Sequence, residues 1–264
     1  MAERKRAVED VELKQLFAGA YPGRRVLVTG HTGFKGSWVG LLEQIRLSDQ
    51  FVHYDDVQYT RGFYNRVQVK VPGAIRWMTV PLRGLHRGQC LNEIVLDESK
   101  KWREEHRRLL AFAHAEAPFR NDVLDLVDSV FASRCENLAD IARASTMALA
   151  KYFGLDDGRS FVDSSSIGIA GHGSQRLLDI CSHFGADCYV TGHGARNYLD
   201  HDLFERHGVR VEYMDYRCET YPQAHGPFTP YVSSLDLIAN CGRSGVERIC
   251  SGSRPWREFL NEST

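Results

Sequence analysis

The sequence lacks an excess of charge of either sign. Of its 264 residues, 33 are Lys or Arg and 34 are Asp or Glu, which leaves a net charge of −1. Attraction to nucleic acid or to anionic lipid requires a surplus of positive charge. The one basic cluster near the start, residues 4–6, is flanked by acidic residues and indicates a solvated helix face. We therefore expect no nucleic acid partner.

Long apolar runs are missing as well. No stretch approaches the roughly 20 apolar residues of a bilayer-spanning helix, so we predict no membrane span. The charged N-terminus has no apolar segment of the kind found in signal peptides. We therefore expect a cytoplasmic protein without a secretory signal.

Cysteine pairs of the C-x-x-C type are absent, although the chain has seven cysteines. An odd number of cysteines without such pairs argues against structural zinc and against a disulfide framework, and we expect reduced thiols. His193, Asp200, His201 and His207 are close in sequence but lack a recognised ligand spacing. We predict no metal site.

What the sequence does contain is an alternation of strand and helix patterns. Residues 1–24 are polar and end in a turn signal, so we interpret them as an N-terminal extension before one α/β domain over residues 25–264. Short apolar runs predict strands at residues 25–29, 51–54, 161–163, 188–191 and 209–214. Helix patterns lie at 38–47 and 175–184, and a shorter one precedes 209. This alternation predicts parallel βαβ units.

A different pattern separates the second predicted strand from the third. Residues 64–71 alternate between polar and apolar, Pro72-Gly73 is a turn signal, and residues 75–80 return as a strand. Helical patterns follow at residues 99–115 and 136–153. The predicted fold is thus α/β, with a mixed sheet, an antiparallel hairpin and a helical middle segment.

A glycine-rich loop follows the first predicted strand. Gly30, Gly33 and Gly36 are spaced three apart, and the loop resembles the TGxxGFxG fingerprint of extended short-chain dehydrogenases. In that fingerprint the glycines let backbone amides approach a pyrophosphate at a helix N-terminus. Asp55 lies about 20 residues later, where an acid for the ribose is expected. The loop therefore supports NAD(P) as an alternative cofactor.

Two features argue against a dinucleotide. A Rossmann half requires a helix and a third parallel strand after its second strand, whereas residues 64–80 supply a hairpin. Those dehydrogenases also use a Tyr-x-x-x-Lys pair, and none of the eleven tyrosines is followed by Lys at the fourth position. We predict that the protein needs no cofactor.

A second resemblance covers much more of the chain. Tyr54-Asp55-Asp56-Val57-Gln58, then Asn65-Arg66, then Trp77 to Pro81 occur in the order typical of the WbqC-like family of bacterial polysaccharide and secondary-metabolite gene clusters. Further matches follow through Trp102-x-x-x-His106, Ser174-x-Arg176, the Gly192 turn with Tyr198, and Tyr221-Pro222-Gln223-x-His225. The resemblance extends over about residues 38–264. Aligned on Trp38, the family histidine falls on His31, but its following Gln-Pro is replaced by Thr32-Gly33.

The resemblance implies a set of site residues. The catalytic candidates are His31, Asp55, Asp56, His106 and His225. The substrate-binding candidates are Gln58, Asn65, Arg66, Arg176, Gly192 and Tyr198. From the residues alone the alternatives stay open: the aspartates also fit a helix cap or a partner for Arg66, and a histidine within a helix also fits simple packing. We predict that five of these residues converge on one cleft: His31, one of Asp55 or Asp56, Asn65, Arg66 and His225.

The resemblance also implies a function. It suggests an enzyme of O-antigen-type glycan or secondary-metabolite biosynthesis that acts on a sugar or nucleotide-sugar. The leading hypothesis is a transferase that moves an aminoacyl or other acyl group, such as glycine, to an amino sugar. One alternative is an NAD(P)-dependent nucleotide-sugar oxidoreductase that uses the glycine-rich loop. The other is a non-catalytic binding module of a biosynthetic complex.

Overall fold

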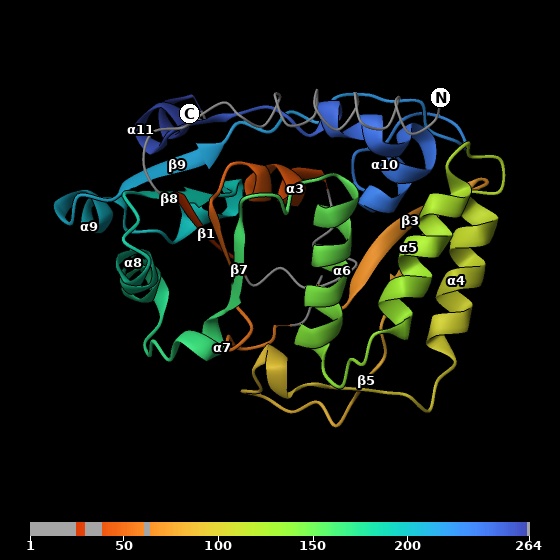
Figure 1. Ribbon diagram of the computed structural model, residues 1–264, viewed down its shortest axis with the longest axis horizontal. Helices are drawn as coiled ribbons and strands as arrows, with labels where there is room; N and C mark the ends of the chain where they lie inside the picture. The colour runs from red at the N-terminus through yellow and green to blue at the C-terminus, as the bar shows by residue number, and fades with distance from the viewer. Residues whose placement is uncertain (1–24, 30–38, 61–63, 263–264) are drawn as a thin grey trace.

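The computed structural model describes residues 25–29, 39–60 and 64–262 of the chain. A six-stranded sheet has the strand order β10-β9-β8-β1-β2-β7, and its strands β9, β8, β1 and β7 are labelled in Figure 1. The strands are β1 (Arg25–Thr29), β2 (Gln50–His53), β7 (Ser160–Asp163), β8 (Cys188–Thr191), β9 (Arg210–Met214) and β10 (Ser253–Pro255). All neighbouring pairs are parallel except β9 with β10, which is antiparallel. Four-residue strands such as β8, whose residues are all buried, suit a sheet covered on both faces.

The order of these strands reverses at the centre of the sheet. The chain proceeds outward from β1 to β2 and β7, and then returns to the other side of β1 for β8 and β9. The carboxyl ends of β1 and β8 therefore lead to connections on opposite sides. In open α/β sheets, ligands bind in the crevice at such a switch point.

Alternating side chains of the strands serve two separate cores. Phe51 belongs to a core that includes residues of α3 (Val39–Arg46) and α6 (Leu138–Tyr152). Its neighbour Val52 belongs to a second core with α8 (Gly173–His183). Helices α9 (His201–Arg206) and α11 (Trp256–Asn261) contribute to this second core. Period-two alternation along the strands thus explains why both faces of the sheet are covered.

The segment between β2 and β7 forms its own layer beside the sheet (Figure 1). Strands β3 (Arg66–Val71) and β4 (Ala74–Thr79) form an antiparallel hairpin around Pro72-Gly73. Helix α4 (Trp102–Ala113) packs on β3, and α5 (Arg120–Ala132) packs on both α4 and α6. Helix α10 (Ser234–Cys241), from near the C-terminus, also packs on α5. The shorter elements are β5 (Leu82–Arg83), η1 (Leu91–Glu93), β6 (Val95–Leu96), α7 (Ser164–Ile167), η2 (His193–Asn197) and η3 (Gly242–Arg248).

The predicted fold class is confirmed, with parallel βαβ units, the hairpin and a helical middle segment. Helix α5 was not predicted, although its buried Val123, Val127 and Val130 have helical spacing. The expectation that a hairpin stands in place of the third parallel strand, which argued in part against a dinucleotide site, is wrong. That strand is β7, which pairs with β2 after the inserted layer, so the chain retains a doubly wound order.

The proposed extension, residues 1–24, and the glycine-rich loop lie outside the described residues. In the part of the chain that the structure describes, none of the helices combines the length and apolarity that a bilayer crossing requires.

Candidate functional site

A cleft of about 410 Å³ opens at the carboxyl edge of the sheet, between the ends of β2 and β8. Helix α3 contributes Gln44, and the N-terminal half of α8 contributes Gly173 and Leu177. The remaining lining residues are Tyr54, Val57, Gln58, Tyr64, Tyr189, Thr191, Gly192, Gly194, Ala195 and Tyr198. The cleft thus adjoins the switch point, where the fold is expected to bind ligands.

The lining of this cleft is aromatic and uncharged among the described residues. It contains four tyrosines, two glutamines and one threonine beside aliphatic residues and glycines. Tyr189 is buried, whereas Tyr198 is 62% exposed and stands at the surface. Aromatic faces bind apolar ring surfaces, and amides and hydroxyls orient a polar ligand through hydrogen bonds.

Gly192 has a steric role in the cleft. A Cβ atom at this position would lie 2.5 Å from Nε2 of Gln44, closer than real Cβ atoms approach other atoms. The same Gln44 Nε2 lies 3.2 Å from Sδ of Met214, which holds the amide across the end of β8. Glycine at position 192 therefore leaves room for the Gln44 amide to reach the lining.

Asp55 is a buried carboxylate held by the start of α7. Its Oδ1 accepts hydrogen bonds from the backbone N of Ser165 at 2.9 Å and from Oγ of Ser164 at 3.0 Å. Its Oδ2 accepts from Oγ of Ser165 at 2.6 Å and from Nδ2 of Asn92 at 3.4 Å. Burial raises the pKa of Asp55, but these hydrogen bonds outweigh it and leave the pKa below its ordinary value. Asp55 is thus an ionised anchor between β2 and the β7–α7 junction.

Asp56 pairs with Arg176 behind the wall of the cleft. Oδ2 of Asp56 lies 2.5 Å from Nη2 of Arg176, a residue in the first turn of α8. The Arg176 guanidinium also stands over the Tyr54 ring, 4.8 Å from its centroid, and its Nε donates to the carbonyl oxygen of Ile169. The cation is therefore fixed against a tyrosine that lines the cleft.

The two aspartates converge, which an extended strand would not allow. Oγ of Ser164 contacts Oδ1 of Asp55 and lies 2.5 Å from Oδ1 of Asp56. Side chains of adjacent strand residues point to opposite faces. Here β2 ends at His53, and the aspartates occupy the turn after it, so the alternation no longer applies. The sequence offered Arg66 as an alternative partner for an aspartate; among the described contacts, Asp56 pairs with Arg176.

His106 lies in the inserted layer and does not line the cleft. Its Nε2 donates to the carbonyl oxygen of Thr79 at 3.0 Å, and its ring packs edge-on against Trp102. Burial lowers the pKa of His106 to about 4, so the ring is neutral at pH 7. Two further buried histidines, His53 and His114, likewise have a pKa lowered to about 4 by burial. The contacts of His106 fit the packing alternative.

His225 belongs to a C-terminal loop fastened to the same layer. Its Nε2 donates to the carbonyl oxygen of Ala113 at 2.7 Å, at the end of α4. Nearby, the buried Lys70 donates to Oε1 of Gln223 and to the carbonyl oxygens of Gly226 and Pro227. These hydrogen bonds hold the loop against β3. The described contacts therefore do not bring His225 to Asp55, as the single-cleft hypothesis requires.

Asn65 and Arg66 form the open end of the hairpin. Nδ2 of Asn65 donates to the carbonyl oxygen of Val80, and the backbone N of Val80 donates back to Asn65. The Arg66 guanidinium stacks 4.4 Å from the centroid of the Trp77 ring. Their neighbour Tyr64, rather than either of them, lines the cleft.

The predicted site residues thus fall into three groups. Gln58, Gly192 and Tyr198 line the cleft, while Asp56 and Arg176 stand behind Tyr54. Asp55 anchors the turn, and Asn65, Arg66, His106 and His225 make contacts within the inserted layer. His31 lies outside the described residues, as do Gly30, Gly33 and Gly36.

Several cleft residues were missed from the sequence, chiefly Gln44, Tyr54, Tyr64 and Thr191. A signal for two of them was present. Tyr54 and Thr191 directly follow or end parallel strands, and polar residues at those ends are the usual ligand contacts. Gln44 gave no signal, because it lies within an otherwise ordinary amphipathic helix.

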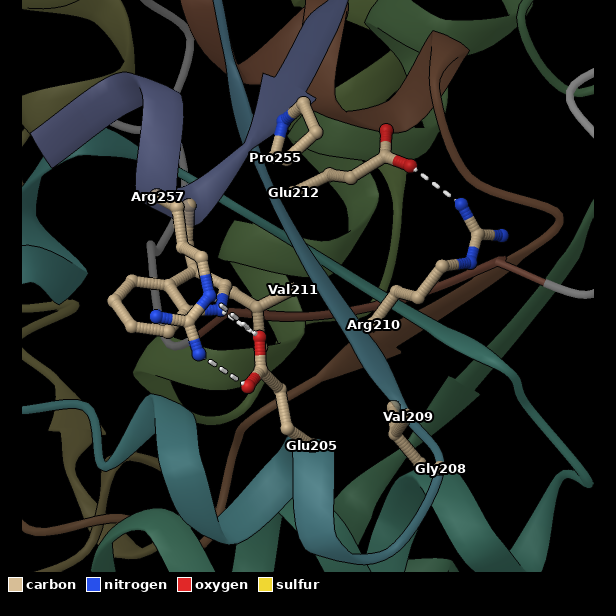
Figure 2. A pocket seen from close by; sticks show the side chains of 9 residues that line it. Glu205, Gly208, Val209, Arg210, Val211, Glu212, Pro255 and Arg257 are labelled. Carbon is tan, nitrogen blue, oxygen red and sulfur yellow. Dashed lines mark hydrogen bonds and ion pairs between the residues drawn. The ribbon is translucent and has the colours of Figure 1, made fainter. Parts of the chain in front are cut away.

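A second hollow, of about 250 Å³, lies at the far edge of the sheet between α9, β9 and α11 (Figure 2). Its charged side chains are engaged with one another. Arg257 pairs with Glu205 at 2.6 Å, and Arg210 pairs with Glu212 at 2.8 Å. Because the charged side chains among its described lining residues are paired with one another, this hollow is a poorer candidate for a ligand site than the switch-point cleft.

Metal binding finds no support in the part of the chain that the structure describes. No group of three or more His, Cys, Asp or Glu side chains there is placed to hold a metal ion.

Comparisons with known proteins agree with the family suggested by the motifs. The sequence model of the WbqC-like protein family matches residues 37–248. An uncharacterised protein of Mycobacterium tuberculosis, Rv1507c, is 32% identical over 216 residues, which are 80% of this chain and 92% of that protein. No solved structure matches the chain. The family match contains every residue that lines the cleft.

Replacing Asp55 with Asn tests whether it is an anchor. We expect Asp55→Asn to lower the free energy of unfolding by about 1–3 kcal/mol at pH 7, because an amide NH₂ replaces an oxygen that accepts buried hydrogen bonds. The pKa of Asp55 is lowered by folding, so its contribution is present above the unfolded pKa of about 3.9 and is lost as pH falls through the folded value. Urea unfolding at pH 7 and pH 3 measures both effects. Asp125→Asn, at an exposed position of α5, is the control. An unchanged stability would contradict the anchor.

His106→Gln tests whether burial lowers the pKa of His106. The unfolded chain takes up a proton at this residue near pH 6.5, whereas the folded chain does so only near 4. Between these values, protonation favours the unfolded state, so the wild-type free energy of unfolding falls by up to about 1.4 kcal/mol per pH unit from this residue. Glutamine does not titrate, and the variant should lose less stability between pH 7 and pH 5. His86→Gln, at an exposed histidine, is the control. Equal slopes for wild type and His106→Gln would show that His106 titrates normally.

Proposed function

The chain belongs to the WbqC-like protein family, and from this premise we propose that it is a biosynthetic enzyme whose switch-point cleft holds the sugar ring of a small-molecule substrate. The proposed reaction transfers an aminoacyl or other acyl group, such as a glycyl group, to the amine of an amino sugar. Its products are O-antigen-type glycans or related metabolites.

One observation carries this proposal: the cleft is lined by tyrosine rings, amides and a hydroxyl, without a charged side chain among its described lining residues. A sugar ring has apolar C–H faces that pack on aromatic rings. Its hydroxyls both donate and accept hydrogen bonds, as do the Gln44 and Gln58 amides and the Thr191 hydroxyl. A volume of about 410 Å³ lies in the range of small-molecule sites and is sufficient for a sugar ring with its substituent.

Acyl transfer further requires donors for a developing oxyanion and a group that moves protons. The turn from Gly192 into η2 supports the first requirement, because the first N–H groups of a helix have no intrahelical partner. Asn65 and His106 are poorer candidates than the sequence suggested, since their side-chain N–H groups donate to Val80 and Thr79. His31 remains a predicted base.

NAD(P)-linked oxidoreduction is the second candidate function. The doubly wound strand order supports it, because β1, which precedes the glycine-rich sequence in the chain, lies at the switch point. The state of Asp55 opposes it, because both carboxylate oxygens already accept hydrogen bonds from Ser164, Ser165 and Asn92. A ribose would have to displace these donors. The proposal therefore assigns no dinucleotide to the site.

The reaction is tested by mass spectrometry of the gene cluster's product, made with and without this protein. We expect the product made without it to lack the mass of one acyl group, and about 57 Da identifies a glycyl group from its C₂H₃NO composition. A change of 2 Da would indicate oxidoreduction instead. An unchanged product would contradict catalysis and favour a non-catalytic binding module.

Tyr198→Ala links that reaction to the cleft. Removing an exposed ring that lines it should lower kcat/KM for the amino sugar about 2- to 13-fold, the effect of losing one aromatic contact. Tyr231→Ala is the matched control, because Tyr231 is 77% exposed and does not line the cleft. Equal losses in both variants would count against the cleft as the sugar site.

Titration with NAD and NADP separates the two candidate functions. We expect no saturable change in tyrosine and tryptophan fluorescence or in heat, because Asp55 cannot serve the ribose without losing its internal partners. A Kd in the micromolar range that is lost in Gly33→Val would reverse the ranking of the two functions.

A further inference from the structure

We propose that Tyr54 is the residue that transfers protons in the cleft, that Arg176 stabilises its ionised form, and that Asp56 holds Arg176 in place. The inference rests on the proposed function, because it names the acid and base of that same site. Tyr54 was not among the catalytic candidates from the sequence.

Tyr54 combines access to the cleft with a fixed cation. It follows β2 directly and lines the cleft, and the Arg176 guanidinium stands 4.8 Å from the centroid of its ring. Arg176 cannot turn away easily, because its Nη2 is 2.5 Å from Oδ2 of Asp56 and its Nε donates to Ile169 at 2.9 Å. Its side chain is only 7% exposed. Buried charge of this kind interacts more strongly than charge in water.

The groups that surround the Tyr54 phenol have opposing effects on its pKa. Burial raises the pKa of Tyr54 above its ordinary value. The charge of Arg176 and a hydrogen bond with Arg176 oppose this rise without cancelling it, and the charge of Asp56 adds to it. The neighbouring Tyr189 is neutral, with its own pKa raised by burial. Tyr54 is therefore protonated at neutral pH and can act as a donor. When it has lost its proton, the phenolate faces a fixed guanidinium.

Few of the other lining residues could transfer protons in the cleft. Among the described lining residues, the tyrosines alone carry an ionisable side chain. Tyr189 is buried at 1% exposure within the second core, and Tyr198 stands largely in solvent. Tyr54 is the lining tyrosine for which the described contacts place a guanidinium over the ring. The described contacts thus give Tyr54 both access to the cleft and a fixed cation.

The proton transfers balance without an additional reagent. The sugar amine attacks the carbonyl carbon of an activated acyl ester or thioester, so a C–N bond forms and the bond from carbon to the leaving oxygen or sulfur breaks. Tyr54 gives its phenolic proton to that leaving atom. The phenolate, beside Arg176, then takes one proton from the nitrogen that has become positively charged. The products are the amide and the neutral alcohol or thiol, and Tyr54 returns to its starting state.

The effect of the Arg176 charge on the Tyr54 pKa is tested by an NMR-monitored pH titration of protein labelled with ¹³Cζ-tyrosine. Tyr54→Phe assigns the resonance by its disappearance. In Arg176→Met, the Tyr54 titration should move up by at least about one pH unit, since the cation opposing ionisation is gone. If that variant does not fold, Arg176→Met with Asp56→Asn removes the whole pair and leaves no carboxylate unpaired. An upward shift is still expected, because the effect of Arg176 on the Tyr54 pKa outweighs that of Asp56.

Arg107→Met with Asp128→Asn is the control for the double change, because it removes an exposed ion pair between α4 and α5. It should leave the Tyr54 titration unchanged. A Tyr54 midpoint that does not rise when Arg176 is removed would overturn the charge relation, and an equal rise in the control would do the same.

Catalysis is tested by product formation in Tyr54→Phe. We expect kcat to fall at least 100-fold while KM for the amino sugar changes less than threefold, because phenylalanine keeps the ring but not the proton. Arg176→Lys should retain more activity than Arg176→Met, since it keeps the charge. Wild-type kcat in Tyr54→Phe would overturn the role of Tyr54. If the wild-type protein itself forms no acylated product, the proposed function fails instead, and the two failures are thus distinguished.

Discussion

Two adjacent carboxylates, Asp55 and Asp56, form the connection on which the site depends. They leave β2 in one turn and bind elements more than 100 residues away in sequence: Asp55 holds the start of α7, and Asp56 holds Arg176 of α8. A buried charge that loses its partner is strongly destabilising, so these contacts permit little variation in the turn. Tyr54 and Val57, on either side of the pair, are thereby fixed as one wall of the cleft.

Two of the catalytic candidates from the sequence, His106 and His225, make their described hydrogen bonds within the layer between β2 and β7. Lys70, on the hairpin, is buried and binds three acceptors in the 223–227 segment, which brings the far end of the chain onto β3. Gln223 in turn donates to Asp236 of α10, whose pKa is raised by burial. Polar residues that are satisfied in this way specify how the layer closes. His225 takes part in these contacts through its hydrogen bond to the carbonyl oxygen of Ala113.

Local patterns predicted most of the fold, because period-two alternation and short apolar runs are properties of neighbouring residues. The hairpin and the strands β7, β8 and β9 were found this way. The pairing of β2 with β7 was not, since about 100 residues of inserted chain separate them and no local signal reports pairing across it. The same limit applies to the site. Gln58, Gly192 and Tyr198 were recognised from motifs, but the partners of Asp55 and the cation beside Tyr54 exist only after folding.

The placement of charge around the cleft suits a reaction that creates charge and then removes it. Under the proposed function, the neutral lining receives the sugar ring without the desolvation cost of a charged side chain at the surface of contact. The ion pair behind Tyr54 contributes little to that ground state, because the phenol is neutral there. Once the phenol ionises, the fixed guanidinium acts across a short distance in a partly buried setting, where its effect exceeds that in water. An interaction that strengthens only as charge develops lowers the barrier without tightening substrate binding, and a cation held behind an aromatic wall has that property.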